Sequence, residues 1–346
     1  MSSDGASTSG HTPAVVCLGE SMAVLLPDPP GPFEAVDTFR VAFGGAESNV
    51  ACGLAALGVT SAWVSRVGDD GLGRRLKAEI AAHGVDVSAV TTDPLRRTGL
   101  YLKETGTSSS RLHYYRAGSA ASALGREVFD DPVFRQLLDG ARILHLSGIT
   151  PALSDSCLDL VHALLARRRP GLLISFDLNW RPALWLDRDP AVLPALLDAA
   201  DLLFLGADEA ETAFGTGDPA ALRRMFPSPA TIVVKDSGHR VTALAEDGTA
   251  VTEPALTVEV VEPTGAGDAF AAGYLAGTVR GLDRRSRLRL GHLSAAAALT
   301  THGDHATPAP GPVINALLAA SAADWAATRV TALGIDSPAL PAVAAF

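Results

Sequence analysis

The stretch EPTGAGDAF, residues 262–270, is the part of this sequence around which the rest can be organised. The small-residue run AAGYLAG follows it at residues 271–277, and the pattern predicts a helix that begins near Gly265. Gly265 and Gly267 lack the Cβ atoms that would hold a ligand away from the backbone. The first N–H groups of a helix have no intrahelical partner and carry the positive end of its dipole. The sequence therefore predicts an anion site at the start of this late helix.

Asp268 stands in the first turn of the same predicted helix. Its negative charge would repel a phosphate group, so anion binding alone does not explain the residue. A carboxylate at this place could accept the proton of a hydroxyl group that attacks phosphorus. An ordinary helix start, with Thr264 as the cap and Asp268 favoured by the dipole, accounts for the same residues without a ligand. The stretch by itself leaves both interpretations open.

Two common nucleotide motifs do not fit the sequence. The dinucleotide motif G-x-G-x-x-G requires glycine where Phe270 stands. A Walker A loop requires a Gly-Lys pair, and none of the three lysines, Lys77, Lys103 and Lys235, follows a glycine.

Composition indicates a globular protein with a sizeable core. The 346 residues correspond to about two domains, or to one large α/β domain with an insertion, and 47% of them are hydrophobic against 19% charged. The net charge of −10 argues against a nucleic-acid surface, so an anionic substrate would need local arginines.

Cys17, Cys52 and Cys157 show no CxxC spacing, which indicates neither a disulfide framework nor a zinc site. No signal peptide and no apolar run of about 18 residues is found, so we expect a cytoplasmic protein without a membrane span.

The hydrophobic pattern predicts a parallel sheet covered on both faces, because strands and helices alternate from residue 143 onward. Residues 1–13 are expected to be a disordered tail, and residues 308–346 a helix over 313–328 with an unstructured end. Two β-prone runs, 98–103 and 111–116, predict a hairpin. Strands are predicted over 14–18, 23–26, 62–67, 143–146, 172–177, 202–205 and 231–235. One predicted helix follows the turn at 43–45, and other helices are predicted over 72–83, 154–168, 191–199 and 292–301.

Two loops follow predicted strands and are candidates for ligand binding. Residues 177–182, DLNWRP, close the strand at 172–177, and residues 235–240, KDSGHR, close the strand at 231–235. Ligands of parallel sheets bind beyond the carboxyl ends of the strands. Plain surface loops would explain both segments equally well.

Taken together, these motifs resemble the two signatures of the PfkB, or ribokinase-like, family of carbohydrate kinases. The first resemblance is GGAESN at 44–49 and the second is PTGAGD at 263–268, and the similarity covers about residues 15–303. Within the family the chain is similar to the 2-keto-3-deoxygluconate kinases, through GE at 19–20, TGLY at 98–101, YYRAGSA at 114–120 and DLNWR at 177–181.

The resemblance implies a doubly wound, mainly parallel α/β sheet in a kinase domain over residues 14–307. A small β-sheet lid would come from about 19–45 and 98–116. It also implies ATP and Mg²⁺ as cofactors, with a monovalent cation such as K⁺ in some relatives. The implied partners are a small sugar acid and ATP, with no nucleic acid and no membrane, and a homodimer through the lid is an assembly the resemblance allows.

The resemblance also assigns roles to residues. Asp268 would be the base, and Gly265, Ala266 and Gly267 would form the anion hole. Glu209 would act on Mg²⁺ through water. The implied substrate-binding residues are Gly44, Gly45, Asn49, Tyr101, Tyr114, Arg116, Asn179 and Arg181, and the implied ATP-binding residues are Lys235, Ser237, Gly238, Arg240 and Ser294.

Arg116 and Arg181 are the residues on which the substrate class depends. A planar guanidinium pairs well with a carboxylate, so two arginines at one pocket would suit a sugar acid. Arg181 could instead brace its loop against Asp177, and Arg116 could contact the ATP phosphates. A fructokinase or other ketose kinase, and a sugar or nucleotide sensor without catalysis, remain alternatives.

Some positions depart from the family pattern. Gly206 replaces the usual asparagine of N-x-x-E, Ser237 and Arg240 replace two loop glycines, and Glu262 replaces an aspartate. None of these changes touches the expected base or anion hole.

Overall fold

An eight-stranded sheet forms the centre of the protein. The computed structural model describes residues 12–29, 31–105, 110–301, 303 and 306–341, so residues 1–11 of the expected tail lie outside the described residues. The strand order is β14-β13-β12-β11-β10-β9-β1-β4. All neighbours pair in parallel except β12 with β13 and β13 with β14. The strands are β1 (Val15–Leu18), β4 (Ser61–Val64), β9 (Ile143–Ser147), β10 (Leu173–Asp177), β11 (Leu202–Gly206), β12 (Thr231–Asp236), β13 (Arg240–Ala245) and β14 (Ala250–Pro254).

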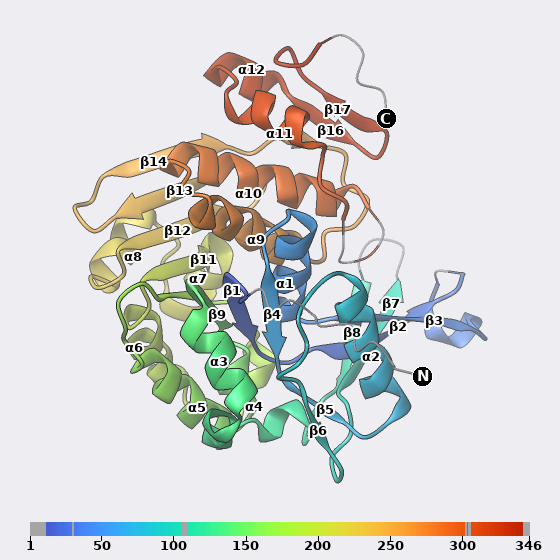
Figure 1. Ribbon diagram of the computed structural model, residues 1–346. Helices are drawn as coiled ribbons and strands as arrows, with labels where there is room; N and C mark the ends of the chain where they lie inside the picture. Colours follow the sequence, from blue (N-terminus) through green and yellow to red (C-terminus); the bar gives the residue numbers. More distant parts are fainter. Residues whose placement is uncertain (1–11, 30, 106–109, 302, 304–305, 342–346) are drawn as a thin grey trace, which may run out of the picture.

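Helices cover both faces of this sheet (Figure 1). In β1, Val15 and Cys17 join one apolar cluster, while Val16 and Leu18 join the other, as the alternation of side chains along a strand requires. The first cluster includes side chains of α1 (Ala46–Ala56), α2 (Gly71–Ala82), α9 (Ala266–Val279) and α10 (Arg284–Leu299). The second includes side chains of α3 (Pro132–Gly140), α4 (Thr150–Leu153), α5 (Asp155–Leu165), α6 (Leu193–Asp198), α7 (Ala207–Phe214) and α8 (Pro219–Met225). The expectation of a doubly wound, mainly parallel sheet is confirmed.

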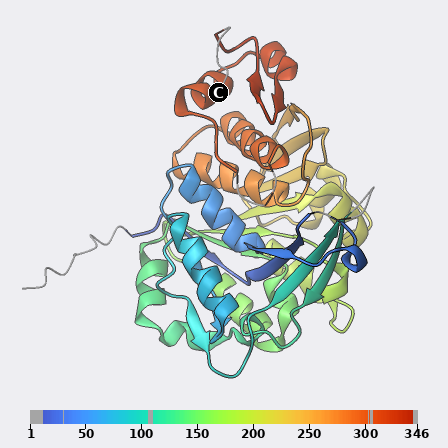
Figure 2. The same ribbon diagram turned by 90° about the vertical axis from the view of Figure 1, so that its right-hand side faces the viewer.

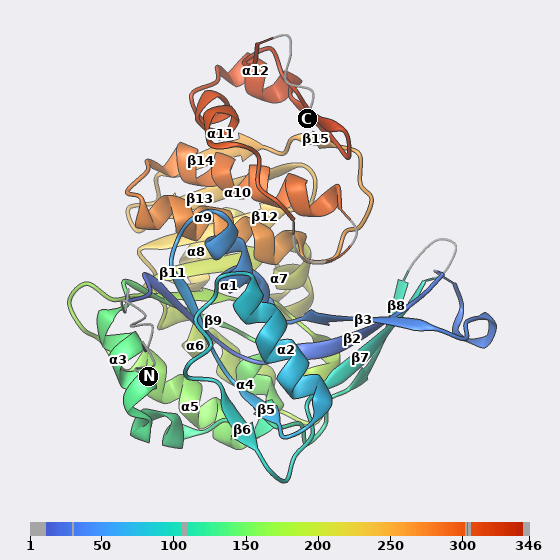
Figure 3. The ribbon, with the colours of Figure 1, turned by 45° about the vertical axis from the view of Figure 1, so that its right-hand side comes forward.

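A four-stranded sheet extends from one side of the body, as Figure 3 shows. Its order is β3-β2-β7-β8, and its strands are β2 (Met22–Pro27), β3 (Phe39–Gly44), β7 (Leu100–Thr105) and β8 (Ser110–Tyr115). β7 and β8 pair as an antiparallel hairpin whose turn, residues 106–109, lies outside the described residues. We call this sheet the lid. Beside it, β5 (Arg66–Gly68) and β6 (Thr91–Asp93) form a two-stranded sheet.

The C-terminal segment differs from the expected single helix over 313–328. It forms α11 (Gly311–Leu318) and α12 (Ala322–Ala327), because Ser321 begins a new helix by accepting the Asp324 N–H. The end expected to be unstructured contains β16 (Arg329–Thr331) and β17 (Gly334–Asp336), which join β15 (Thr257–Val258) in a third sheet. Figure 2 shows this segment stacked beyond α10.

Two further elements differ from the sequence-based expectation. The helix expected over 292–301 begins at Arg284, where Asp283 accepts the Ser286 N–H as its cap. The antiparallel strands β13 and β14, at one end of the sheet, were not expected. Short 3₁₀ turns occur at Phe33–Ala35, Ala121–Ala123, Arg126–Asp130, Pro182–Leu184 and Pro190–Val192. Across the described ranges, every helix is too short or too polar to cross a lipid bilayer.

Candidate active site

One cleft of about 1070 Å³ lies between the lid, the carboxyl ends of β10, β11 and β12, and the N-termini of α1 and α9. Nearly all residues that the sequence singled out line it: Gly44, Gly45, Asn49, Tyr101, Tyr114, Arg116, Asn179, Arg181, Glu209, Lys235, Ser237, Gly238, Arg240, Gly265, Ala266, Gly267 and Asp268. Ser294 does not line this cleft. Its hydroxyl donates to the Leu290 carbonyl at 2.9 Å, and it lines a separate cavity of about 280 Å³.

The anion turn, residues 264–268, has the form that its glycines predict. Gly265 adopts φ 81°, a left-handed conformation that favours glycine, and α9 begins directly after it. The first hydrogen bond of the helix runs from Ala269 N–H to Gly265 O at 2.9 Å. The N–H groups of Ala266, Gly267 and Asp268 therefore lie before the first i→i−4 hydrogen bond of α9. Thr264 is not the cap. Its hydroxyl donates to Glu262 Oε1 at 2.8 Å, and the turn opens toward the cleft.

Two asparagine side chains hold the Asp268 carboxylate. Asn49, on α1, donates from Nδ2 to Asp268 Oδ2 at 2.9 Å, and Asn179, after β10, donates from Nδ2 to Oδ1 at 3.4 Å. Asn179 has φ 41°, an uncommon conformation for a residue with a side chain, and its N–H donates to Asp177 Oδ1 at 3.2 Å. Its Oδ1 is buried and accepts no hydrogen bond from the described residues. The loop after β10 therefore places an amide that fixes the carboxylate and offers an acceptor to a ligand hydroxyl.

Lys235 lies beside the anion turn. Its Nζ is 2.8 Å from Asp177 Oδ2 and 3.7 Å from the point where a Cβ on Gly267 would lie. Burial alone would lower the pKa of Lys235, but the carboxylates of Asp177 and Glu209 raise it above its usual value. The sequence grouped this lysine with the nucleotide loop, whereas its ammonium group lies next to the turn that would bind the transferring phosphoryl group.

Glu209 and Asp208 present carboxylates to the same wall of the cleft. A Cβ on Gly206 would lie 2.9 Å from Glu209 Oε2 and 3.0 Å from Asp208 Oδ1, so glycine leaves room for both groups. Burial raises the pKa of Glu209, and Lys235 opposes the shift. Arg181 pairs with Glu209 Oε1 at 3.2 Å rather than with Asp177. The described residues contain no cluster of three metal ligands, but two carboxylates suit Mg²⁺, which keeps several waters and binds largely through substrate phosphates.

Arg116 is held by a carboxylate that the sequence reasoning did not assign. Its Nε donates to Glu20 Oε2 at 2.7 Å, and its NH2 group contacts the same oxygen. Ser119 donates to Glu20 Oε1 at 2.6 Å, and Glu20 is 2% exposed. Glycine at 99 leaves room for this carboxylate, because a Cβ there would lie 2.8 Å from Glu20 Oε1. Arg116 thus turns its Nε and NH2 groups to Glu20, and its side chain also lines the cleft beside Tyr114.

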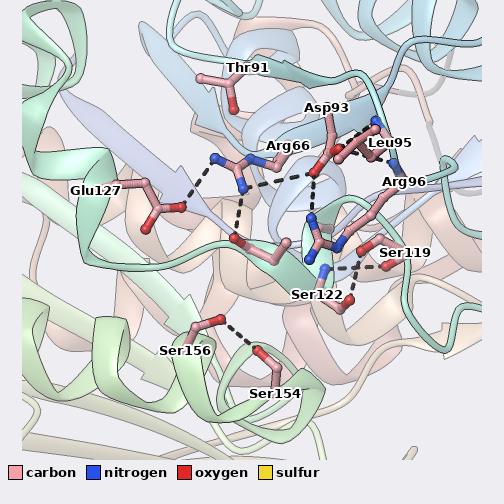
Figure 4. A network of polar contacts seen from close by, with 12 residues as sticks. Arg66, Thr91, Asp93, Leu95, Arg96, Ser119, Ser122, Glu127, Ser154 and Ser156 are labelled. Atoms are coloured by element: carbon pink, nitrogen blue, oxygen red, sulfur yellow. Dashed lines mark hydrogen bonds and ion pairs between the residues drawn. The ribbon is translucent and has the colours of Figure 1, made fainter.

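A polar network fixes the turn that carries Ser119 (Figure 4). Arg66 donates to the Ala123 carbonyl at 2.8 Å and pairs with Glu127 Oε1 at 3.1 Å. Asp93 accepts from Arg96 NH1 at 3.2 Å and lies within 3.9 Å of Arg66 NH1. These contacts join the 119–123 turn to β5 and β6 and keep Ser119 in place beneath Glu20.

Lys103 links the lid to the anion turn. Its Nζ lies 2.5 Å from Glu262 Oε2 and 3.2 Å from Thr264 Oγ1. Burial alone would raise the pKa of Glu262, but hydrogen bonds from Lys103 and Thr264 hold it below its usual value. The sequence contained a signal for this residue, since Lys103 and Tyr101 stand two apart on one strand and therefore share a face.

Glu47 lies on α1 between the cleft-lining residues Ala46 and Asn49. It is fully buried, and Ser147 and Thr150 donate to its Oε1 at 2.7 and 3.1 Å. Burial raises its pKa to about 7. A Cβ on Gly19 would lie 2.1 Å from Glu47 Cδ, which explains glycine at the end of β1.

The end of the cleft beyond Lys235 is mostly apolar. Its walls come from the segment after β14 and from α10: Ala255, Leu256, Thr257, Val258, Val260, His292, Ala295, Ala296 and Leu299. Burial lowers the pKa of His292 to about 4, so its ring is neutral at pH 7. A flat, largely apolar group such as a nucleobase fits this end.

Comparisons with known proteins agree with this arrangement. The family model described as "pfkB family carbohydrate kinase" matches residues 12–310 of this chain. A 2-dehydro-3-deoxygluconokinase of Bacillus subtilis is 36% identical over 84% of this chain and 90% of its own length. Another from Thermoproteus tenax is 35% identical over 89% of this chain and 96% of its own. The crystal structure of 2-dehydro-3-deoxygluconokinase from Thermotoga maritima superimposes with a TM-score of 0.78 at 27% identity, covering 90% of this chain and 99% of that one.

Proposed function

The chain belongs to the pfkB family of carbohydrate kinases, and from this premise we propose that it transfers a phosphoryl group from ATP to the primary hydroxyl of 2-dehydro-3-deoxygluconate. This compound is the 2-keto-3-deoxygluconate named in the sequence analysis. The observation that supports the proposal most strongly is the place of Asp268, whose carboxylate lies at the anion turn between two asparagine amides in a single large cleft. The names of the two relatives supply the substrate.

In the proposed reaction, Asp268 accepts the proton of the sugar hydroxyl as its oxygen attacks the γ-phosphorus. The bond between that phosphorus and the ADP oxygen breaks, and the products are the phosphorylated sugar acid, ADP and a proton. The N–H groups of Ala266, Gly267 and Asp268 donate to the oxygens of the transferring group, and Lys235 adds a positive charge beside them. A positioned base contributes about 10²- to 10⁴-fold to such a rate.

Asp208 and Glu209 are the residues that would hold Mg²⁺, through its water ligands, while ATP supplies the phosphate oxygens. Bound there, the ion would neutralise charge on the phosphates. A monovalent cation near the Gly265 turn belongs to the same proposal, and comparison of initial rates in K⁺ and in tetramethylammonium chloride tests it.

The carboxylate of the sugar acid would bind at the NH1 edge of Arg116. Tyr101 and Tyr114, whose ring centroids lie 5.5 Å apart, would contact the sugar from the lid, and Asn179 Oδ1 would accept a sugar hydroxyl. Arg181 is paired with Glu209, which would limit its contact with the substrate. We therefore assign it a smaller role in substrate binding than Arg116.

A ketose kinase such as a fructokinase is the second candidate. It is favoured by one observation: Glu20 already neutralises Arg116, which weakens the attraction between this end of the cleft and a second carboxylate. A sensor without catalysis would bind the same ligands and release no ADP.

A substrate panel tests the proposal. Purified protein is assayed for ADP release with ATP and Mg²⁺ and with 2-dehydro-3-deoxygluconate, fructose or ribose, against a control without sugar. We expect the highest kcat/KM with the sugar acid. A higher kcat/KM with fructose or ribose would reject the sugar-acid assignment, and ligand binding without ADP release would reject the kinase assignment.

The outer strands of the lid, β3 and β8, have unpaired edges within the described sheet, and we propose that a homodimer forms there. Light scattering on the purified protein tests this, and a monomeric mass at micromolar concentration would reject it.

A further inference from the structure

We propose that the C-terminal segment, residues 311–341, is a positioning element for the nucleotide, because it holds the strand that lines the apolar end of the cleft. This inference rests on the proposed function, which assigns that end to the base of ATP. The segment lies outside the range 12–310 that matches the family description. In Figures 1 and 2 it packs beyond α10 and on the side of the body away from α5 and α6.

The first contact is a strand pairing. β16 of the C-terminal segment pairs in parallel with β15, and the Glu259 N–H donates to the Val330 carbonyl at 2.9 Å. Thr257 and Val258, which make up β15, both line the cleft. In the described part of the chain β15 pairs with no strand except β16. The middle of this wall therefore takes its backbone partners from the C-terminal segment, while its two ends are bonded to the body, from Ala255 N–H to the His239 carbonyl at 3.0 Å and from Val261 N–H to the Leu299 carbonyl at 2.7 Å.

The second contact is made by Trp325, on α12. It is 0% exposed, and its Nε1 donates to the Pro254 carbonyl at 3.0 Å, directly before the cleft-lining residue Ala255. Its ring centroid lies 6.2 Å from that of His292, which lines the cleft and whose ring also lies 5.4 Å from Phe270. Phe270 is two residues beyond Asp268 on α9. Trp325 thus contacts the segment after β14 directly and, through the His292 ring of α10, lies next to Phe270 of α9.

The third contact is the Arg289 side chain of α10, which is 2% exposed. Its NH1 donates to the carbonyls at the end of α11, at 3.1 Å to Leu318 and 2.6 Å to Ala320, where a cation is favoured by the helix dipole. Its Nε donates to Glu253 Oε2 of β14 at 3.0 Å, and its Cζ lies 4.8 Å from the Trp325 ring centroid. One buried cation therefore joins α10, β14 and the C-terminal segment.

These contacts have a specific consequence for binding. A wall that is ordered before the ligand arrives loses little conformational entropy on binding, so the ligand binds more tightly. Loosening the attachment of β15 should weaken ATP binding and leave sugar binding unchanged, because the contacts of β16, Trp325 and Arg289 described above go to β15, β14 and α10, whereas Arg116 is held by Glu20. A segment that served only general stability would not separate the two substrates.

The test compares Trp325→Phe with a matched control in the full-length protein. Phenylalanine keeps a ring against His292 but removes the hydrogen bond to Pro254. We expect the KM for ATP to rise about fivefold, the equivalent of one lost hydrogen bond, while kcat and the KM for the sugar change less than about twofold. Amide hydrogen exchange at residues 255–260 should become faster. The control is Trp63→Phe, since Trp63 is also 0% exposed and donates to a backbone carbonyl, that of Gly19 at 3.2 Å. It should lose comparable stability and keep its KM for ATP.

An unchanged KM for ATP in Trp325→Phe would overturn the proposal, as would an equal rise in the KM for both substrates or an equal rise in the control. Calorimetric titration of both variants with ATP alone gives the same comparison without turnover. If the unaltered protein binds ATP but phosphorylates no sugar, the proposed function fails, and the titration still decides the role of the C-terminal segment.

Discussion

Replacing Arg116 by methionine tests how the cleft selects a sugar acid. Methionine keeps much of the length of the side chain and removes the guanidinium group, whose Nε and NH2 atoms pair with Glu20. Charge-assisted hydrogen bonds to a carboxylate would be lost, and because one such bond is worth about 1.5–3 kcal/mol, kcat/KM for the sugar acid should fall at least about 10- to 150-fold. A neutral ketose, which lacks the carboxylate, should lose less than about threefold.

The same substitution also affects folding, since Glu20 is 2% exposed and Arg116 is its charged partner. Removing one member of a buried ion pair costs about 3–5 kcal/mol of unfolding free energy. The double variant Glu20→Gln/Arg116→Met removes both charges and should recover most of that loss. It should not recover activity toward the sugar acid, so the double variant separates substrate recognition from stability.

The assay is steady-state ADP release with each sugar, accompanied by urea unfolding of the same preparations. If the double variant loses equal kcat/KM toward the sugar acid and the ketose, Arg116 does not recognise the carboxylate and serves the ATP phosphates or the lid instead. If the single variant keeps the unfolding free energy of the unaltered protein, the ion pair with Glu20 is not buried in solution as we describe it.

Three further substitutions test other parts of the structure. Glu47 has a pKa near 7 in the folded protein against an ordinary 4.5, so the unfolded state releases its proton first and stability falls by about 3 kcal/mol as pH rises from 4.5 through 7. Glu47→Gln should remove this fall. The free energy of unfolding is measured in urea at pH 5.5 and pH 8 for the unaltered protein and for the variant, and an equal change with pH in both would contradict us. Gly265→Ala forces a side chain to adopt φ 81°, which costs about 1–2 kcal/mol of stability, and it should lower kcat; an unchanged kcat would mean that the turn does not bind the transferring group. Lys103→Met breaks the pair between the lid and Glu262 and should raise the KM for both substrates, whereas a rise for one alone would show that Lys103 acts at a single subsite.

The sequence predicted the body of the fold because the relevant signals are local. β9, β10, β11 and β12 are short apolar runs with helices between them, and this alternation defines a parallel sheet. The C-terminal strands were missed for the opposite reason. β16 forms by pairing with β15, about 70 residues earlier in the chain, and a tertiary partner of this kind leaves no periodic pattern in a three-residue strand.

The candidate site also combines residues that the sequence identifies with contacts that only the fold reveals. Glycines and carboxylates in a recognisable order identified the anion turn and Asp268, and the structure brings the predicted residues other than Ser294 to one cleft. The partners of these residues could not be read from the sequence. Glu20 lies 96 positions from Arg116, and Lys103 lies 159 positions from Glu262, so each pair forms only when the lid folds over the body. The sequence thus located the groups that we propose to react, and the fold determines which charges remain available to a ligand.

The central claim is that Asp268 takes the proton from the sugar hydroxyl, and the most direct measurement is the rate of a single turnover by Asp268→Asn. The substitution keeps the shape of the side chain and removes its basicity, so the rate of phosphoryl transfer should fall about 10²- to 10⁴-fold. Binding of ATP and of the sugar acid, measured by calorimetry, should change less than about threefold. A single-turnover rate within tenfold of the unaltered enzyme, with both ligands still bound, would contradict the assignment of Asp268 as the base.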